Sequence, residues 1–70
     1  MTQWKPARAR QVIVALPRIG WSIKRQSGSY QVLARPGWPD VVVAFPDCEE
    51  IGPRMLARIA RVTGLMPDDL

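Results

Sequence analysis

Apolar residues recur along the chain at two spacings, one typical of helices and one typical of strands. Near the N-terminus they fall three and four residues apart, at Ala9, Val12, Ile13, Leu16 and Ile19. This spacing predicts a helix that begins near Pro6. Because Pro17 lacks a backbone donor, the helix either stops near Leu16 or kinks into a last turn before Gly20.

Three short segments in the middle of the chain are rich in aromatic and β-branched residues, as strands are. They cover residues 21–26, 30–35 and 40–45. Turn residues separate them, at Gly28 and across 36–39. Such short connections favour an antiparallel meander of three strands.

A second helix is expected near the C-terminus, because Gly52-Pro53 is typical of a helix start and Gly64 of a helix end. Its apolar stripe comprises Met55, Leu56, Ile59 and Val62, and we expect this stripe, Met55 included, to lie in the core. Arg54, Arg58 and Arg61 fall together on another face. That face is either solvated or turned toward phosphates or carboxylates.

The order of helix, three strands and helix predicts one α+β domain over residues 1–70. Both helices would cover one face of a three-stranded antiparallel sheet. This is the arrangement found in double-stranded-RNA-binding domains (dsRBD-like).

Charge is unevenly distributed along the 70 residues, whose net charge is +4. Seven of the ten basic residues precede Asp40, which is the first acidic residue. A cationic half of this kind matches a polyanion such as RNA, because neutralising phosphates releases counterions. The alternatives are that these charges only solvate a small domain, or that they bind an acidic partner.

Several kinds of chemistry are disfavoured by what the sequence lacks. It has one cysteine, Cys48, and no histidine, so we expect no internal disulfide, no metal site and no cofactor. Without a general base beside it, Cys48 is interpreted as a bystander. The longest apolar run, 41–45, is too short to span a membrane, and no signal peptide is recognisable. A cytoplasmic protein fits these features.

The segment from Lys24 to Tyr30 combines basic residues, a Gly-Ser turn and a tyrosine at the start of a new strand. Gly28 can adopt positive φ, so two strands can reverse direction here and gather polar side chains at one sheet edge. Together with the other early bases, this segment supplies the candidate RNA-binding residues. They are Lys5, Arg8, Arg10, Lys24, Arg25, Gln26, Ser27, Gly28, Ser29 and Arg35.

Over nearly its full length the chain resembles the HicA-type toxins, also called YcfA-like. The matching segments are Ile19-Gly20-Trp21, Arg25-Gln26-Ser27-Gly28-Ser29, Arg35-Pro36, and Ile51-Gly52-Pro53 through Leu56, Ile59 and Gly64-Leu65. The resemblance implies an mRNA interferase, which is an endoribonuclease, held inactive by a HicB-type antitoxin protein. It also implies a catalytic histidine directly after the Gly-Ser turn, where this chain has Tyr30.

Three interpretations of Tyr30 are open. An imidazole exchanges protons near neutral pH, whereas a phenol titrates near ~10, so cleavage could be abolished or greatly weakened, leaving an RNA-binding or antitoxin-binding module. Alternatively, Tyr30 supports slower cleavage as a proton or hydrogen-bond donor. In the third interpretation, Tyr30 only packs on the sheet.

Strand alternation bears on these alternatives. If Leu33 points into the helix-covered core, Tyr30 and Val32 lie on the open face of the sheet, which is the arrangement we favour, whereas the opposite register would bury the tyrosine. Lys24 and Arg25 have opposite parity, so both can reach one ligand only if a bulge intervenes.

The three tryptophans are the largest apolar side chains in the sequence. Trp21 is expected in the core. Trp4 and Trp38 are expected to cover the edges of the core, and a partner contact is the functional alternative for Trp38.

Overall fold

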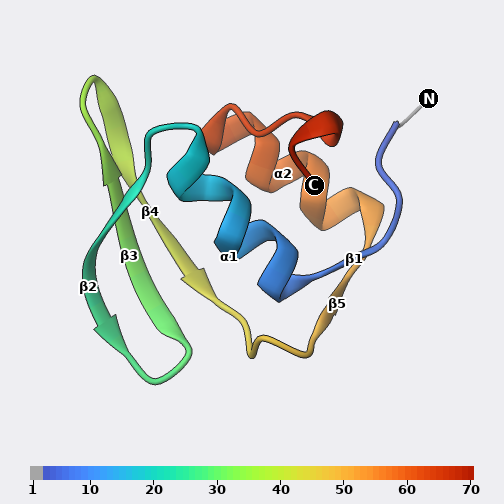
Figure 1. Cartoon of the computed structure of the whole chain (residues 1–70), viewed down its shortest axis with the longest axis horizontal. Coiled ribbons are helices and arrows are strands. Elements are labelled where there is room, and N and C mark those ends of the chain that lie inside the picture. The colour runs from blue at the N-terminus through green and yellow to red at the C-terminus, as the bar shows by residue number, and fades with distance from the viewer. Residues whose placement is uncertain (1–2) are drawn as a thin grey trace.

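Two helices lie against one face of a three-stranded antiparallel sheet in the computed structural model, which describes residues 3–70 (Figure 1). The sheet has the order β2-β3-β4. The elements are β1 (Ala7–Arg8), α1 (Ala9–Arg18), β2 (Ser22–Ser27), β3 (Tyr30–Arg35), β4 (Trp38–Ala44), β5 (Glu50–Ile51), α2 (Pro53–Thr63) and the 3₁₀ turn Pro67–Asp69. The α+β class and the dsRBD-like arrangement are therefore confirmed.

The first helix begins later than its apolar spacing predicts. Residues 7–8 are extended and form a short antiparallel ladder with β5. The first helical N–H groups then find acceptors in the chain before β5, because Ala9 donates to the Glu49 carbonyl at 2.8 Å and Arg10 to the Asp47 carbonyl at 3.1 Å. Pairing with a distant segment thus replaces the first turn that Pro6 would have opened.

The end of α1 follows the second of the two predicted possibilities. The helix continues through Pro17 to Arg18. Gly20 then takes a φ of 104°, and the N–H of Trp21 donates to the Leu16 carbonyl at 3.1 Å. The chain leaves the helix at this glycine and enters β2.

Two tight turns connect the strands of the sheet. Gly28 and Ser29 join β2 to β3, and the φ of 59° at Gly28 suits a type II′ turn. Pro36 and Gly37 join β3 to β4, with a φ of 83° at Gly37. The expected turn over 36–39 is thus too long, since Trp38 and Pro39 already belong to β4, an edge strand in which proline is tolerated.

The second helix has the predicted ends, with Gly52 before it and Gly64 after it at a φ of 78°. The prediction for its buried face was partly wrong. Leu56 and Ile59 are buried, but the side chains of Met55 and Val62 are 37% and 48% exposed. Thr63 is buried instead, and its hydroxyl is satisfied because it donates to the Ile59 carbonyl at 2.7 Å within the helix.

A cluster of aromatic and cationic side chains joins the sheet to the C-terminal ends of both helices. Trp21 is buried, as expected, and donates from Nε1 to the Thr63 carbonyl at 2.9 Å. Its ring meets that of Trp38 edge-on, and the Arg35 guanidinium lies 4.8 Å from the centroid of Trp38. Trp38 thus covers the edge of the core, as expected.

No helix within residues 3–70 has the length and apolar character needed to cross a membrane.

Candidate functional site

The side of the sheet that faces away from the helices is called the open face here. On the central strand β3, Tyr30, Val32 and Ala34 alternate with the buried residues Gln31 and Leu33. The strand register places Ser22, Arg25 and Ser27 of β2 and Val42 and Ala44 of β4 opposite them. The open face is therefore made of small and apolar residues with one arginine among them.

Tyr30 points outward, as favoured from the strand alternation, and its side chain is 45% exposed. Its cross-strand partners are Ser27 on one side and Ala44 on the other. Directly opposite residues have Cβ atoms about 5 Å apart, so two small neighbours leave an aromatic ring uncovered. The phenol is thus accessible to a planar group that approaches the sheet.

A β-bulge in β2 brings Arg25 to the same face as Tyr30. Ile23 pairs with Leu33, and the next paired residue, Arg25, faces Val32, so Lys24 is the extra residue. Without this residue out of register, the parity of the strand would send Arg25 to the other face. Arg25 lies diagonally from Tyr30, at a Cβ separation of about 7 Å, within reach of a long side chain.

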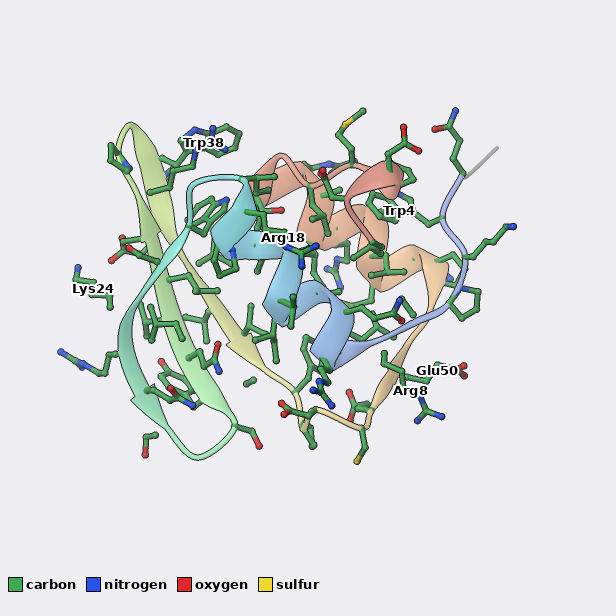
Figure 2. The ribbon with its side chains drawn as sticks, viewed as in Figure 1. Trp4, Arg8, Arg18, Lys24, Trp38 and Glu50 are labelled. Carbon is green, nitrogen blue, oxygen red and sulfur yellow. The ribbon has the colours of Figure 1, made fainter. Side chains whose placement is uncertain are left out.

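Lys24 forms an ion pair on this part of the sheet. Its Nζ lies 2.9 Å from a carboxylate oxygen of Asp40, which belongs to β4. Figure 2 shows Lys24 on the side of the sheet away from the helices. Both partners are about half exposed, at 60% and 45%, so the pair is screened by water and contributes little stability. It does occupy Lys24, which leaves Arg25 as the adjacent cation without an ion pair within residues 3–70.

Among the other candidate residues of the sheet, Gln26 and Arg35 do not share a surface with Tyr30. Gln26 pairs with Gln31 and therefore has the parity of the helix-facing side. Arg35 ends β3, five residues from Tyr30 or about 16 Å along the strand. Gly28 and Ser29 form the turn that begins β3 beside Tyr30.

The three bases nearest the N-terminus lie around the start of α1. The Arg8 guanidinium donates to the Cys48 carbonyl at 2.8 Å. Arg10 lines a hollow there with Asp47, and Lys5 lines another beside the C-terminal residues. Figure 2 shows Arg8 and Lys24 on opposite sides of the molecule. The cationic first half of the sequence is thus divided into separate surfaces.

One buried polar group beside the site had no signal in the sequence. The side chain of Gln31 is 7% exposed, and its Oε1 has no hydrogen-bond partner in the described part of the chain. Gln31 directly follows Tyr30 in β3, and its side chain lies on the face of the sheet that the helices cover. Alternation places Gln31 on the core side, but sequence alone cannot show whether a buried amide finds a partner.

The open face has the parts of a nucleic-acid site. An exposed ring can stack on an unpaired base, and a guanidinium can bind a phosphate. A phenol can donate a hydrogen bond or a proton. Within residues 3–70 no group of histidine, cysteine, aspartate or glutamate side chains is placed to hold a metal ion.

Comparison with known proteins points to one family. Residues 9–65 match the family model described as the HicA toxin of bacterial toxin–antitoxin. The match covers both helices and the whole three-stranded sheet. No curated protein matches the chain.

Proposed function

Because the chain belongs to the HicA family of bacterial toxins, we propose that it binds single-stranded RNA on the open face. We further propose that Tyr30, in the position of the family's histidine, makes RNA cleavage much weaker than a histidine would. The observation that carries this proposal is the β-bulge at Lys24, which aligns Arg25 with Tyr30 on one face. A stacking ring and an unpaired guanidinium then lie within the span of one nucleotide.

The proposed weakness in cleavage follows from the chemistry of the side chain. Cleavage of RNA by its own 2′-hydroxyl needs a group that removes a proton from that oxygen and one that protonates the leaving oxygen. An imidazole can do either near neutral pH, whereas a neutral phenol can only donate. The sequence contains no histidine. Tyr30 is therefore proposed to position RNA and to stabilise charge by hydrogen bonding.

Membership of a toxin–antitoxin family implies an antitoxin as partner. We propose that this partner is a HicB-type protein, that the RNA is mRNA, and that the toxin acts in the cytoplasm, where mRNA is translated.

A non-catalytic binding module of the same fold is the second candidate function. The arrangement around Tyr30 supports it, because its cross-strand partners, Ser27 and Ala44, offer no general base. In this case the open face would bind RNA or the antitoxin and no bond would break.

RNA binding can be measured by fluorescence anisotropy with a labelled single-stranded RNA at low salt. Tyr30→Ala should weaken binding about 5-fold to 150-fold, because stacking contributes about 1–3 kcal/mol per base, and Tyr30→Phe should retain most of the affinity. Arg25→Gln should weaken binding and lower the salt slope by about 0.7.

The matched control is Arg54→Gln, which makes the same change of charge on α2, away from the open face. It should leave binding within about 2-fold of the unsubstituted chain. A chain that ignores RNA at low salt would contradict the proposal, as would equal binding by Tyr30→Ala and the unsubstituted chain.

A further inference from the structure

The outer surface of α2 carries three arginines whose charges are unpaired. Arg54, Arg58 and Arg61 are exposed and have no ion pair within the described residues. Unlike the other two, Arg61 lies between two hollows and lines both of them. This position distinguishes Arg61 from a cation that only solvates the helix.

The two hollows are mainly apolar, and each contains a tryptophan. One has a volume of about 350 Å³ and is lined by Trp38, Val41 and Val62 beside Arg61. The other has a volume of about 630 Å³ and is lined by Trp4, Ala57 and Met66 beside Arg61. Figure 2 shows Trp4 and Trp38 well apart, with α2 between them. The exposed fractions of Val62 and Met66, 48% and 61%, show that this apolar surface is open.

This composition matches the energetic centre of a protein interface. Tryptophan and arginine are the side chains that dominate such centres, and methionine is enriched around them. Apolar contacts on both sides of a guanidinium exclude water when a partner binds. An ion pair formed there is then stronger than one on an open surface.

The chemistry of the surface favours an acidic protein segment over RNA. Its cations form a stripe along one helix and complement acidic groups, while the mainly apolar hollows on both sides of Arg61 complement apolar side chains, so a protein segment that carries both kinds of group matches this surface. The sheet also separates this surface from the open face, where the RNA is proposed to bind.

We propose that this surface, formed by Trp4, Trp38, Ala57, Arg61, Val62 and Met66 and called the α2 docking surface, binds an acidic segment of the antitoxin. One carboxylate of that segment pairs with Arg61, and apolar side chains on either side of it fill the two hollows. This inference rests on the proposed function, because it assumes an antitoxin as the partner. It places an antitoxin contact across the sheet from Tyr30, so binding at this surface alone leaves the open face uncovered.

The test uses the full chain and the protein encoded beside its gene, with dissociation constants measured by isothermal titration calorimetry. Arg61→Gln should weaken binding about 10-fold to 100-fold. Arg54→Gln, an identical change on the same helix but outside both hollows, should stay within about 2-fold. Both variants should bind single-stranded RNA equally well and melt at the temperature of the unsubstituted chain.

A second pair of variants tests the hollows. Val62→Asp places a negative charge among the apolar groups of the smaller hollow and should weaken binding at least 10-fold. Val14→Asp makes the same change on α1 at nearly equal exposure, 46% against 48%, and should have little effect.

The outcomes separate this inference from the function on which it rests. If the unsubstituted chain binds its encoded neighbour but Arg61→Gln and Arg54→Gln weaken binding equally, the docking surface is wrong and the antitoxin assignment stands. If Arg61→Gln weakens RNA binding more than Arg54→Gln does, the surface belongs to RNA. If the unsubstituted chain does not bind its neighbour at all, the antitoxin assignment fails, and this inference fails with it.

Discussion

At the scale of residues, the accessibility of Tyr30 depends on the size of its neighbours. Ser27 and Ala44 lie directly opposite it on the two outer strands, so Tyr30 is 45% exposed although it lies on the central strand. Large side chains at either position would cover the ring. Neither Ser27 nor Ala44 carries a group that could take a proton from the phenol.

Gln31, the residue after Tyr30, is buried and lowers the stability of the fold by an amount that can be measured. The Gln31 side chain is buried with an unpaired amide oxygen, and such a group costs about 1–3 kcal/mol. Gln31→Met keeps a similar shape and removes the polar atoms, so it should raise stability by about 1 kcal/mol. The melting temperature, followed by circular dichroism, should rise by about 4–8 °C.

The control for this prediction is Gln26→Met. Gln26 pairs with Gln31 across the ladder but is exposed, so its substitution should change stability by less than about 0.5 kcal/mol. A melting temperature that stays constant or falls in Gln31→Met would mean that the amide has a stabilising partner, such as bound water.

At the scale of elements, the bulge in β2 decides what the sheet presents. A regular strand would place Lys24 and Arg25 on opposite faces, whereas the extra residue lets Arg25 share a face with Tyr30. The exposure of Tyr30 follows from simple alternation and was predictable from the sequence. The position of Arg25 was not, because no local signal marks which residue of a polar edge strand leaves the register.

The helices show the same division between local and distant causes. Gly52-Pro53 and Gly64 are local signals, and they predicted the ends of α2 correctly. The start of α1 depends on a ladder of two residue pairs between segments more than 40 residues apart, so the sequence spacing placed it too early. The prediction that Met55 lies in the core was wrong for a related reason. How many residues of a helix are buried depends on which elements pack against it, and the sequence of the helix does not show this.

The C-terminal end of α2 offers a sharp test of how the elements fit together. At Gly64 a Cβ would lie 3.1 Å from Trp38 Cη2, and Trp38 is held by Arg35 and Trp21. Gly64→Ala should therefore lower the free energy of unfolding, measured by urea denaturation, by about 2–3 kcal/mol, because the backbone is strained and the Trp38 ring is displaced.

Gly37→Ala is the matched control, because Gly37 has a similar φ, 83° against 78°, and nothing lies within 4 Å of its added Cβ. It should lose only about 1 kcal/mol, the cost of the strained backbone. Equal losses in the two variants would show that Trp38 moves freely and does not join the sheet to the helices.

At the scale of the whole molecule, the sheet separates two surfaces of different chemistry. The open face combines an aromatic ring with one unpaired guanidinium, and the α2 docking surface combines apolar hollows with Arg61. The charge bias of the sequence predicted a polyanion-binding protein but not this division. A linear sequence shows how many cations precede the first acid, whereas the fold determines which of them lie together.

We propose that the toxin meets RNA and its antitoxin at these two separate surfaces. RNA would approach Tyr30 and Arg25, while an acidic antitoxin segment would bind across the sheet. The Arg35 cluster connects the two sides, since it joins the end of β3 to the ends of both helices. The guanidinium of Arg35 packs over the ring of Trp38, away from Tyr30, whereas the sequence named Arg35 only as a candidate RNA-binding residue.

The central claim is that this toxin retains an RNA-binding face while Tyr30 limits cleavage. The most direct measurement is the rate at which a labelled single-stranded RNA is cut by the unsubstituted chain and by Tyr30→His near neutral pH. The account predicts slow or undetectable cutting by the unsubstituted chain and a rate at least about 100-fold higher for Tyr30→His, because a positioned general acid or base contributes about 10²–10⁴. Rapid cutting by the unsubstituted chain that Tyr30→His does not increase would contradict it.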